Sequence, residues 1–256
     1  MIKPLKNIGI VGCGWLGIRL AQHLTANNRI YTTTTSEEKA ETLTALNFTP
    51  SVINFDQAED IQKNEEWKNL DCIIITVPFP RSKEEKFLER RCQQINSFLK
   101  GYQNQLFMMS TIGIYLTSEG IVSEKNIDQK SLNTKILTVE NSIKTEFPQL
   151  NILRLAGLMG DDRYLSKYKI SEPNQLANHI HYEDVIFIIE KMIHLEMNNK
   201  CYNLVAPEHP TKQQILDYQT QKRYSENVSG YGKKIISELL PSELNYAYKH
   251  PNPIYF

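Results

Sequence analysis

The sequence has no excess of charge of either sign. Its 256 residues include 29 Lys and Arg against 29 Asp and Glu, so the formal net charge is zero. Nucleic-acid grooves and anionic membrane surfaces attract proteins through an excess of basic residues. We therefore expect neither a nucleic acid nor a membrane to be the partner of this chain.

Long apolar runs and clustered cysteines are also missing. A helix that spans a bilayer needs about 20 apolar residues, whereas the most apolar run, Cys72–Val77, has only the length of a strand. The first residues lack the apolar core of a signal peptide. The four cysteines show neither Cys-x-x-Cys nor the His spacing of a zinc site. These absences predict a cytoplasmic protein with buried, reduced thiols and no bound metal.

Strand and helix patterns alternate along the first half of the chain. Apolar and β-branched runs predict strands at Ile8–Val11, Ile30–Thr34, Val52–Phe55, Asp71–Val77 and Gln105–Met109. Apolar residues at helical spacing predict helices at Trp15–Ala26, from an N-cap at Ser36 to about Leu46, and at Ser82–Tyr102. Such alternation is typical of a parallel sheet covered by helices on both faces. The predicted fold class is therefore α/β, with a Rossmann-type doubly wound parallel sheet.

The second half of the chain continues the pattern more weakly. It predicts helices at Leu132–Phe147, Glu183–Met197 and Thr211–Lys222, strands at Asn151–Leu155 and Tyr202–Val205, and an irregular tail from Tyr224 to Phe256. No polar linker or internal repeat separates the halves. We therefore predict a Rossmann core of residues 1–156 and a smaller α/β lobe of residues 157–256 packed on it as one integrated unit.

A glycine-rich turn follows the first predicted strand and opens the first predicted helix. Its sequence, Gly12-Cys13-Gly14-Trp15-Leu16-Gly17, is GxGxxG. The first glycine permits a tight turn, the second lets the backbone approach a pyrophosphate, and the third lets helix and sheet pack closely. The backbone N–H groups of the helix start, at Gly14, Trp15 and Leu16, then face the phosphates. A purely structural turn is the alternative, but the context favours a dinucleotide.

The end of the second predicted strand bears on the choice between NAD and NADP. NAD-binding chains usually place an Asp or Glu there to hold the ribose 2′-hydroxyl. Here the stretch is Thr34-Thr35-Ser36, with Lys39 beyond it. Without a carboxylate a 2′-phosphate is not repelled, and hydroxyls and a helix N-terminus can accept it. This favours NADP, with NAD as the alternative; the threonines are also simply good strand formers.

Two further stretches lie where ligands bind in such sheets, beyond the carboxyl ends of the strands. Val77 and Pro78 follow the fourth strand and would form a wall of the nicotinamide pocket, or simply stop the strand. Ser110 opens the stretch Ser-Thr-Ile-Gly-Ile-Tyr, which ends at Tyr115 after the fifth strand. Together with the glycine turn, these residues are the predicted cofactor-binding set.

At this stretch the sequence resembles the extended short-chain dehydrogenase/reductases, the NAD-dependent epimerase/dehydratase family. Ser-Thr-Ile-Gly-Ile-Tyr is similar to the Ser/Thr-rich turn of that family. Three later stretches resemble it in the right order: Leu153–Gly160, Asn178–Val185 with Ile-His-x-x-Asp-Val, and Cys201–Leu204 with Tyr-Asn-Leu. The GxGxxG form resembles an atypical branch. The resemblance implies an NAD(P)-dependent oxidoreductase or epimerase that acts on a small carbonyl or nucleotide-sugar substrate.

The sequence departs from this family at the acid/base pair. The family carries Tyr-x-x-x-Lys on the helix after the Ser/Thr turn, where the lysine lowers the tyrosine pKa. No tyrosine lies between Tyr115 and Tyr164, and Lys135 has no tyrosine partner there. Tyr218 and Lys222 have the spacing but come about a hundred residues too late, where a solvated helix face explains them.

The resemblance leaves Thr111 and Tyr115 as the predicted catalytic residues. Thr111 occupies the family's Ser/Thr position and could polarise a carbonyl, and Tyr115 is a substitute acid or a packed aromatic. His181, with Asp184 nearby, is interpreted as structural. Arg154 could meet an anionic substrate or pair with a carboxylate.

Two other functions fit the same residues. The missing Tyr-Lys pair favours a catalytically inactive NADP-binding sensor or regulator. A hydroxyacid-type dehydrogenase also begins this way, but such enzymes continue into an all-helical second domain, against which the strands at Asn151–Leu155 and Tyr202–Val205 argue. The resemblance further allows a homodimer formed through helices corresponding to Ser82–Tyr102 and Leu132–Phe147.

Overall fold

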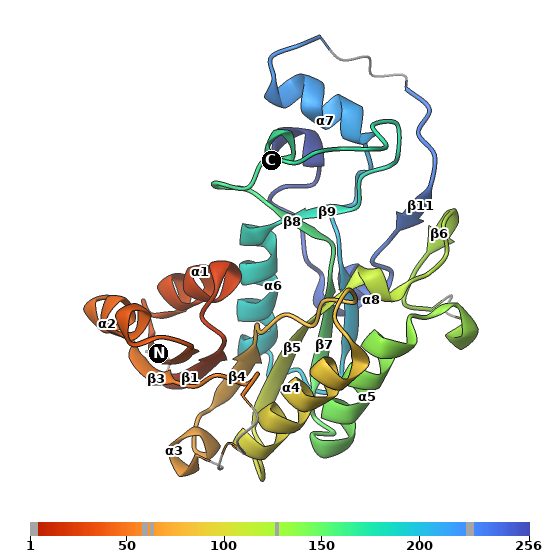
Figure 1. The fold of residues 1–256 in the computed structure, drawn as a ribbon. Helices are drawn as coiled ribbons and strands as arrows, with labels where there is room; N and C mark the ends of the chain where they lie inside the picture. Colours follow the sequence, from red (N-terminus) through yellow and green to blue (C-terminus); the bar gives the residue numbers. More distant parts are fainter. Residues whose placement is uncertain (1–4, 58–60, 62–63, 126–127, 224–227) are drawn as a thin grey trace. The chain divides into compact units, whose positions relative to one another are not determined.

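The structure, a computed structural model, describes residues 5–57, 61, 64–125, 128–223 and 228–256. The chain divides into two units, each assembled from several segments (Figure 1). The first unit contains Met1–Ser110, Thr134–Ile152 and Met192–Lys200, and the second contains Thr111–Asn133, Leu153–Lys191 and Cys201–Phe256. A division into two contiguous parts at residue 156 stays a prediction.

The central sheet has seven strands, in the order β10-β7-β5-β4-β1-β2-β3. The pairings of β1 with β2 and β4, of β2 with β3, and of β4 with β5 are all parallel. The predicted Rossmann-type α/β class is thereby confirmed. The strands are β1 (Lys6–Val11), β2 (Asn28–Thr34), β3 (Thr49–Val52), β4 (Cys72–Ile75), β5 (Gln105–Thr111), β7 (Asn151–Leu155) and β10 (Cys201–Leu204).

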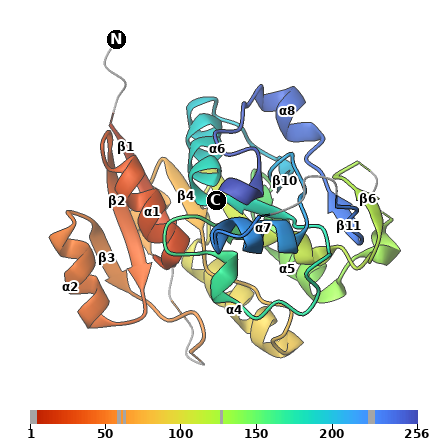
Figure 2. The ribbon, with the colours of Figure 1, turned by 90° about the horizontal axis from the view of Figure 1, so that it is seen from above.

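The helices of the first unit begin where the sequence offers caps or apolar periodicity. α1 buries Leu16, Leu20 and Leu24, which recur every fourth residue, and it packs on β1 and β2 (Figure 2). The hydroxyl of Ser36 accepts a hydrogen bond from the Lys39 N–H and caps α2, as predicted. α4 and α5 pack against each other. The bounds are α1 (Trp15–Leu24), α2 (Glu37–Ala45), α3 (Glu65–Lys68), α4 (Glu85–Phe98) and α5 (Thr134–Glu146).

The core of the first unit centres on β4. All four of its residues are buried, which explains the uninterrupted apolar run at Cys72–Ile75. Trp67 of α3 and Phe98 of α4 close the core beside it, with ring centroids 5.0 Å apart. This rigid centre fixes the carboxyl ends of β1, β2 and β4, where the candidate site lies.

The second unit is built from short strands and helices. β8 (Gly157–Met159) pairs in parallel with β9 (His179–His181), and β6 (Gly120–Val122) pairs with β11 (Lys233–Ile235). Its helices are α6 (Tyr182–His194), α7 (Lys212–Gln219) and α8 (Leu239–Leu244), and its short 3-10 turns are η1 (Ile112–Ile114), η2 (Gln129–Ser131), η3 (Leu165–Lys167) and η4 (Pro253–Tyr255). A core cluster joins β8, η3, α7 and η4 with the loops beside them: Met159, Leu165, Ala177, Ala206, Ile215, Ile254 and Phe256.

Several local predictions differ from the structure, among them the following. β3 lies at Thr49–Val52 rather than Val52–Phe55, because Ile53 and Phe55 are half-buried or buried as loop residues beside the pocket, not as strand residues. α4 is shorter at both ends than predicted, although Leu99 and Tyr102 beyond it are buried. The tail predicted as irregular contains β11, α8 and η4; its residues 224–227 lie outside the described part of the chain.

Two further observations concern the cysteines and the length of the helices. All four cysteines are free thiols, and Cys13, Cys72 and Cys92 are buried, as predicted. Among the described residues, no helix has both the length and the apolar character needed to cross a membrane.

Candidate functional site

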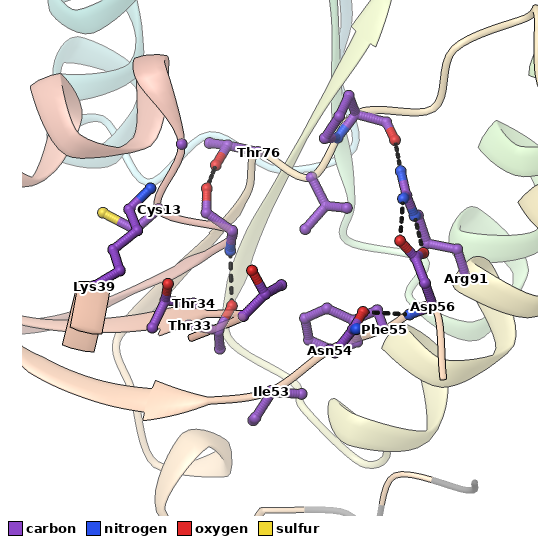
Figure 3. A pocket seen from close by; sticks show the side chains of 15 residues that line it. Cys13, Thr33, Thr34, Lys39, Ile53, Asn54, Phe55, Asp56, Thr76 and Arg91 are labelled. Carbon is purple, nitrogen blue, oxygen red and sulfur yellow. Dashed lines mark hydrogen bonds and ion pairs between the residues drawn. The ribbon is translucent and has the colours of Figure 1, made fainter. Parts of the chain in front are cut away.

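A pocket of about 240 Å³ opens at the carboxyl ends of β1, β2, β3 and β4. The strand order reverses between β1 and β4. From β1 the chain continues outward to β2 and β3 on one side of the sheet, and from β4 it continues to β5 on the other side. Open α/β sheets bind ligands at such a switch point. Its lining residues, which Figure 3 draws as sticks, are Gly12, Cys13, Gly14, Thr33, Thr34, Thr35, Lys39, Ile53, Asn54, Phe55, Asp56, Thr76, Val77, Pro78 and Arg91.

The glycine turn is held in place by the strands on both sides. Gly12 has φ +89°, and a β-carbon there would lie 2.5 Å from Cγ2 of Val77, so only glycine fits. The Gly12 N–H donates to Oγ1 of Thr33 at 2.8 Å, and the Cys13 N–H donates to the Thr33 carbonyl at 2.9 Å. The Thr76 hydroxyl donates to the Gly12 carbonyl from β4's end. The turn is thereby preorganised without a ligand.

The other two glycines differ in what surrounds them. A β-carbon at Gly17 would lie 2.7 Å from the Gly12 carbonyl, so this glycine lets α1 pack against the turn. A β-carbon at Gly14 would meet nothing within 4 Å. Gly14 is the N-cap of α1 and offers no side-chain cap to the helix. The positive end of α1 therefore faces open space in the pocket.

The first two residues of α1, Trp15 and Leu16, are not among the lining residues of the pocket. Leu16 is buried in the face of α1 that packs on the sheet. The Trp15 ring is half-buried and carries the Arg19 guanidinium 3.9 Å above it. Neither side chain lines the pocket, so the predicted role of Trp15 and Leu16 concerns their N–H groups.

The end of β2 supplies hydroxyl groups to the pocket, and α2 supplies one ammonium group. Thr34 is buried, whereas Thr35 and Ser36 are exposed, and Ser36 caps α2 without lining the pocket. Lys39 extends from α2 toward Cys13 of the glycine turn (Figure 3). Burial raises the Cys13 pKa to about 11 although Lys39 opposes that shift, so this thiol is neutral at pH 7. The lysine thus places a positive charge beside the glycine turn.

An ion pair closes the opposite wall of the pocket. Arg91 of α4 binds both carboxylate oxygens of Asp56, through Nε and Nη2, at 2.7 Å each. Its Nη1 also donates to the carbonyl of Pro78 (Figure 3). One side chain therefore fixes the loops after β3 and β4. Sequence analysis missed Asn54, Asp56 and Arg91, because no local pattern links the end of a strand to the middle of a helix 35 residues later.

Ser110, at the end of β5, is not among the lining residues of this pocket. Its hydroxyl donates to Oε1 of Glu140 on α5 at 2.5 Å, and both residues are buried. The same helix bears Lys135, whose ammonium group donates to the Lys83 carbonyl. α5 therefore offers a buried carboxylate to the end of β5 where the resembled family carries a tyrosine and a lysine.

Thr111 and Tyr115, the predicted catalytic residues, lie in the second unit. Oγ1 of Thr111 accepts the Gly113 N–H at 3.0 Å. The Tyr115 hydroxyl donates to Oδ1 of Asn203 at 2.6 Å and accepts from Nη1 of Arg154 at 3.1 Å. Burial raises the Tyr115 pKa, although Arg154 and Asn203 oppose that shift. The hydroxyl is thus held neutral within a buried network.

Several known proteins are similar to this chain in sequence or in structure. No protein-family profile matches the sequence. The chain is 25% identical to Protein YeeZ of Escherichia coli K12 over 98% of both chains. Its structure is similar to the Bordetella bronchiseptica enzyme WbmG in complex with NAD, with TM-score 0.75, 11% identity, and 98% and 92% of the two chains covered. It is also similar to the human epimerase family protein SDR39U1 with NADPH, with TM-score 0.67, 16% identity and 96% of each chain covered.

These similarities extend over nearly the whole chain and concern its fold. The epimerase and short-chain dehydrogenase/reductase fold that the sequence motifs predict is confirmed. At such identities the fold is shared while the chemistry is left to the residues of the site.

Proposed function

We propose that this chain binds a nicotinamide dinucleotide in the pocket at the glycine turn, and that the dinucleotide is NADP. The pocket suits a pyrophosphate, because Gly14 leaves open space beside the start of α1, which has no side-chain cap. A pyrophosphate placed there would receive backbone N–H groups and the helix dipole. Similar folds bind NAD in WbmG and NADPH in SDR39U1, which supports the class of cofactor.

The preference for NADP rests on the charges at the end of β2. Among the described residues that line the pocket, Asp56 is the only one with a carboxylate, and Arg91 already binds both of its oxygens. Lys39 remains as a cation beside Thr34 and Thr35. A 2′-phosphate would meet hydroxyls and an ammonium group there, whereas a 2′-hydroxyl would find no free carboxylate among the lining residues that the structure describes.

The proposed activity is that of an oxidoreductase or epimerase on a small carbonyl or nucleotide-sugar substrate. Bound NADP would supply hydride transfer. The chain would orient the cofactor through the preorganised glycine turn and through Val77 and Pro78. In this proposal Thr111 and Tyr115 are the candidates to polarise or protonate a carbonyl.

A second function, an NADP-binding sensor without turnover, is favoured by α5. In place of the Tyr-x-x-x-Lys pair, this helix buries Ile136, Val139, Glu140 and Ile143. The Tyr115 hydroxyl is also committed to Asn203 and Arg154. The two functions share the cofactor and differ in whether bound NADPH is oxidised by any carbonyl substrate. A homodimer through α4 and α5 is compatible with either and is tested by light scattering.

The first test is a fluorescence titration of the purified chain with NADPH and, separately, with NADH. We expect NADPH to bind at least ten times more tightly. Preference for NADH would overturn the argument from the end of β2 while retaining the dinucleotide site. Binding of neither would contradict the proposed function. If NADPH binds, a screen of aldehydes, ketones and nucleotide sugars distinguishes the enzyme from the sensor.

A further inference from the structure

Three side chains that sequence spacing does not connect meet in the second unit. His181 ends β9, Glu183 lies in the first turn of α6, and His250 lies between α8 and η4. One ligand atom from each of these side chains lies within 4.8 Å of the other two. Two imidazoles and a carboxylate are a donor set typical of zinc sites.

A neighbouring carboxylate fixes the segment that carries His250. Asp184 is fully buried, and its oxygens accept hydrogen bonds from the Tyr246 hydroxyl at 2.7 Å and from the N–H groups of Lys249 at 2.8 Å and His250 at 3.0 Å. The His250 ring consequently stacks on the His181 ring, with centroids 3.7 Å apart. The ligands are therefore held together by contacts that an ion does not have to supply.

The nitrogen atoms face the carboxylate. Oε2 of Glu183 lies 2.6 Å from Nε2 of His250 and 3.8 Å from Nδ1 of His181. Nδ1 of His181 accepts the Glu183 N–H at 3.3 Å, a long hydrogen bond that an ion bound to the same lone pair would replace. The Nε2 side of the same ring is covered by Gly160, where a β-carbon would collide with it. Only Nδ1 of His181 is thus directed at the cluster.

We propose that His181, Glu183 and His250 form a site for a divalent transition-metal ion of the zinc type, bound through Nδ1, a carboxylate oxygen and Nε2. In a tetrahedral zinc site the ligand atoms lie about 3.3 Å apart. The observed separations of 2.6 and 3.8 Å bracket that value. The rings are tilted by only 33°, so binding requires the more exposed His250 ring to rotate.

Lys249 pairs with the carboxylate of this cluster. Its ammonium group lies 2.9 Å from the same Oε2 of Glu183, and its side chain is 53% exposed. Such an exposed lysine can swing into solvent when a divalent ion neutralises the carboxylate. This arrangement leaves a fourth coordination position open to water. The bound ion would tie the end of β9 and the start of α6 to the C-terminal segment.

The test is a calorimetric titration of the untagged full chain with ZnCl2. We expect one ion per chain, with the affinity lowered at least ten-fold in Glu183→Gln and in His250→Gln. His194→Gln removes an exposed histidine at the end of the same helix and should leave the affinity unchanged. Absence of binding to the wild type, or equal affinity in all three variants, would overturn the proposal.

Lys249→Met provides a test of opposite sign. It retains all three ligands and removes the competing charge, so the affinity for Zn²⁺ should rise by several-fold. A purely structural ion pair predicts no gain, and an unchanged or lower affinity would contradict the site. Zn²⁺ should also raise the unfolding temperature of the wild type but not that of His250→Gln, whose folding is checked by circular dichroism without metal.

Discussion

Arg91 of α4 and Asp56, which are 35 residues apart in the chain, join the loops after β3 and β4, and both residues line the candidate pocket. The guanidinium binds both carboxylate oxygens at 2.7 Å, and its third nitrogen donates to the Pro78 carbonyl. The Arg91 side chain is 10% exposed and that of Asp56 is 38% exposed, so solvent only partly screens the pair. Its planar, two-point geometry is specific to arginine.

Replacing Arg91 by Met should therefore loosen the pocket as well as the fold. We expect the free energy of unfolding to fall by about 1.5–3 kcal/mol, the range for hydrogen bonds to charged groups, and NADPH affinity to fall several-fold. Urea unfolding and NADPH titration measure the two effects. Arg91→Lys keeps the positive charge but cannot make the two parallel hydrogen bonds to Asp56. Its stability and its NADPH affinity should lie between those of the wild type and Arg91→Met. Equal stability of Arg91→Met and wild type would show that the pair does not stabilise the loops.

Variants at two glycines of the turn distinguish an effect on folding from an effect on cofactor binding. At Gly14 the backbone has φ −82° and the β-carbon of alanine would meet open space, so Gly14→Ala should cost less than about 1 kcal/mol of stability. The added methyl group would, however, lie between the backbone and a pyrophosphate. NADPH affinity should therefore drop at least ten-fold in a normally folded protein. Unchanged affinity would place the phosphates elsewhere.

Gly12→Ala is the contrasting variant. Its φ of +89° and the collision with Val77 should lower the free energy of unfolding by about 1–3 kcal/mol even without a ligand. Thermal unfolding of both variants checks this order. A Gly12→Ala protein as stable as Gly14→Ala would show that the turn relaxes more easily than its contacts indicate.

Lys39→Met tests the basis of the NADP preference. Removing the ammonium group beside Thr34 and Thr35 should weaken NADPH binding about ten-fold and leave NADH binding nearly unchanged, because only NADPH carries a 2′-phosphate. The loss for NADPH should shrink as salt is added, since the interaction is electrostatic. Equal losses for both dinucleotides would assign Lys39 to the pyrophosphate instead.

Tyr115→Phe distinguishes a structural from a catalytic hydroxyl. The variant deprives Asn203 and Arg154 of their shared partner, so a structural role predicts a loss of about 1–3 kcal/mol in unfolding free energy. NADPH affinity should not change. If a substrate is found, a Phe variant of normal stability that lacks turnover would instead support the role of Tyr115 as an acid.

Stability should fall in mild acid because of His209. Burial lowers its pKa to about 4, with Lys234 adding to that shift and the Ala177 backbone opposing it. The unfolded chain takes up a proton near pH 6.5, whereas the folded chain does so only near pH 4. Stability is therefore complete above about pH 6.5 and is lost as the pH falls toward 4.

Urea unfolding at pH 7.5 and pH 5 measures this dependence. His209→Asn should lose less stability between the two values than the wild type, whereas replacement of the exposed His194 by Asn should not alter the difference. If all three proteins lose the same amount, the acid sensitivity comes from groups other than His209.

Local sequence signals predicted the parts of the site that local geometry controls. The glycine turn, the buried β4 run and the Ser36 cap each depend on neighbours within a few residues, and the structure contains them where predicted. The Asp56–Arg91 pair depends on tertiary packing between distant segments, so no spacing rule could reveal it. The same holds for His181, Glu183 and His250, of which the last lies 67 residues beyond Glu183.

The position of β3 shows a case in which a local sequence signal gave a wrong prediction. Apolar residues at Val52–Phe55 resemble a strand, yet the ladder with β2 runs from Thr49 to Val52 and includes Pro50. Hydrophobicity alone misplaced the strand because Phe55 is buried as a loop residue, while an edge strand tolerates proline.

Pro50 also limits how this protein can associate with other chains. β3 is the last strand at its end of the central sheet, and an exposed edge of this kind is a template for pairing with a foreign strand. With only four residues and a proline that has no N–H to donate, β3 offers an incomplete ladder. The edge is thus protected against sheet extension, so aggregation through this strand should be disfavoured even at high protein concentration.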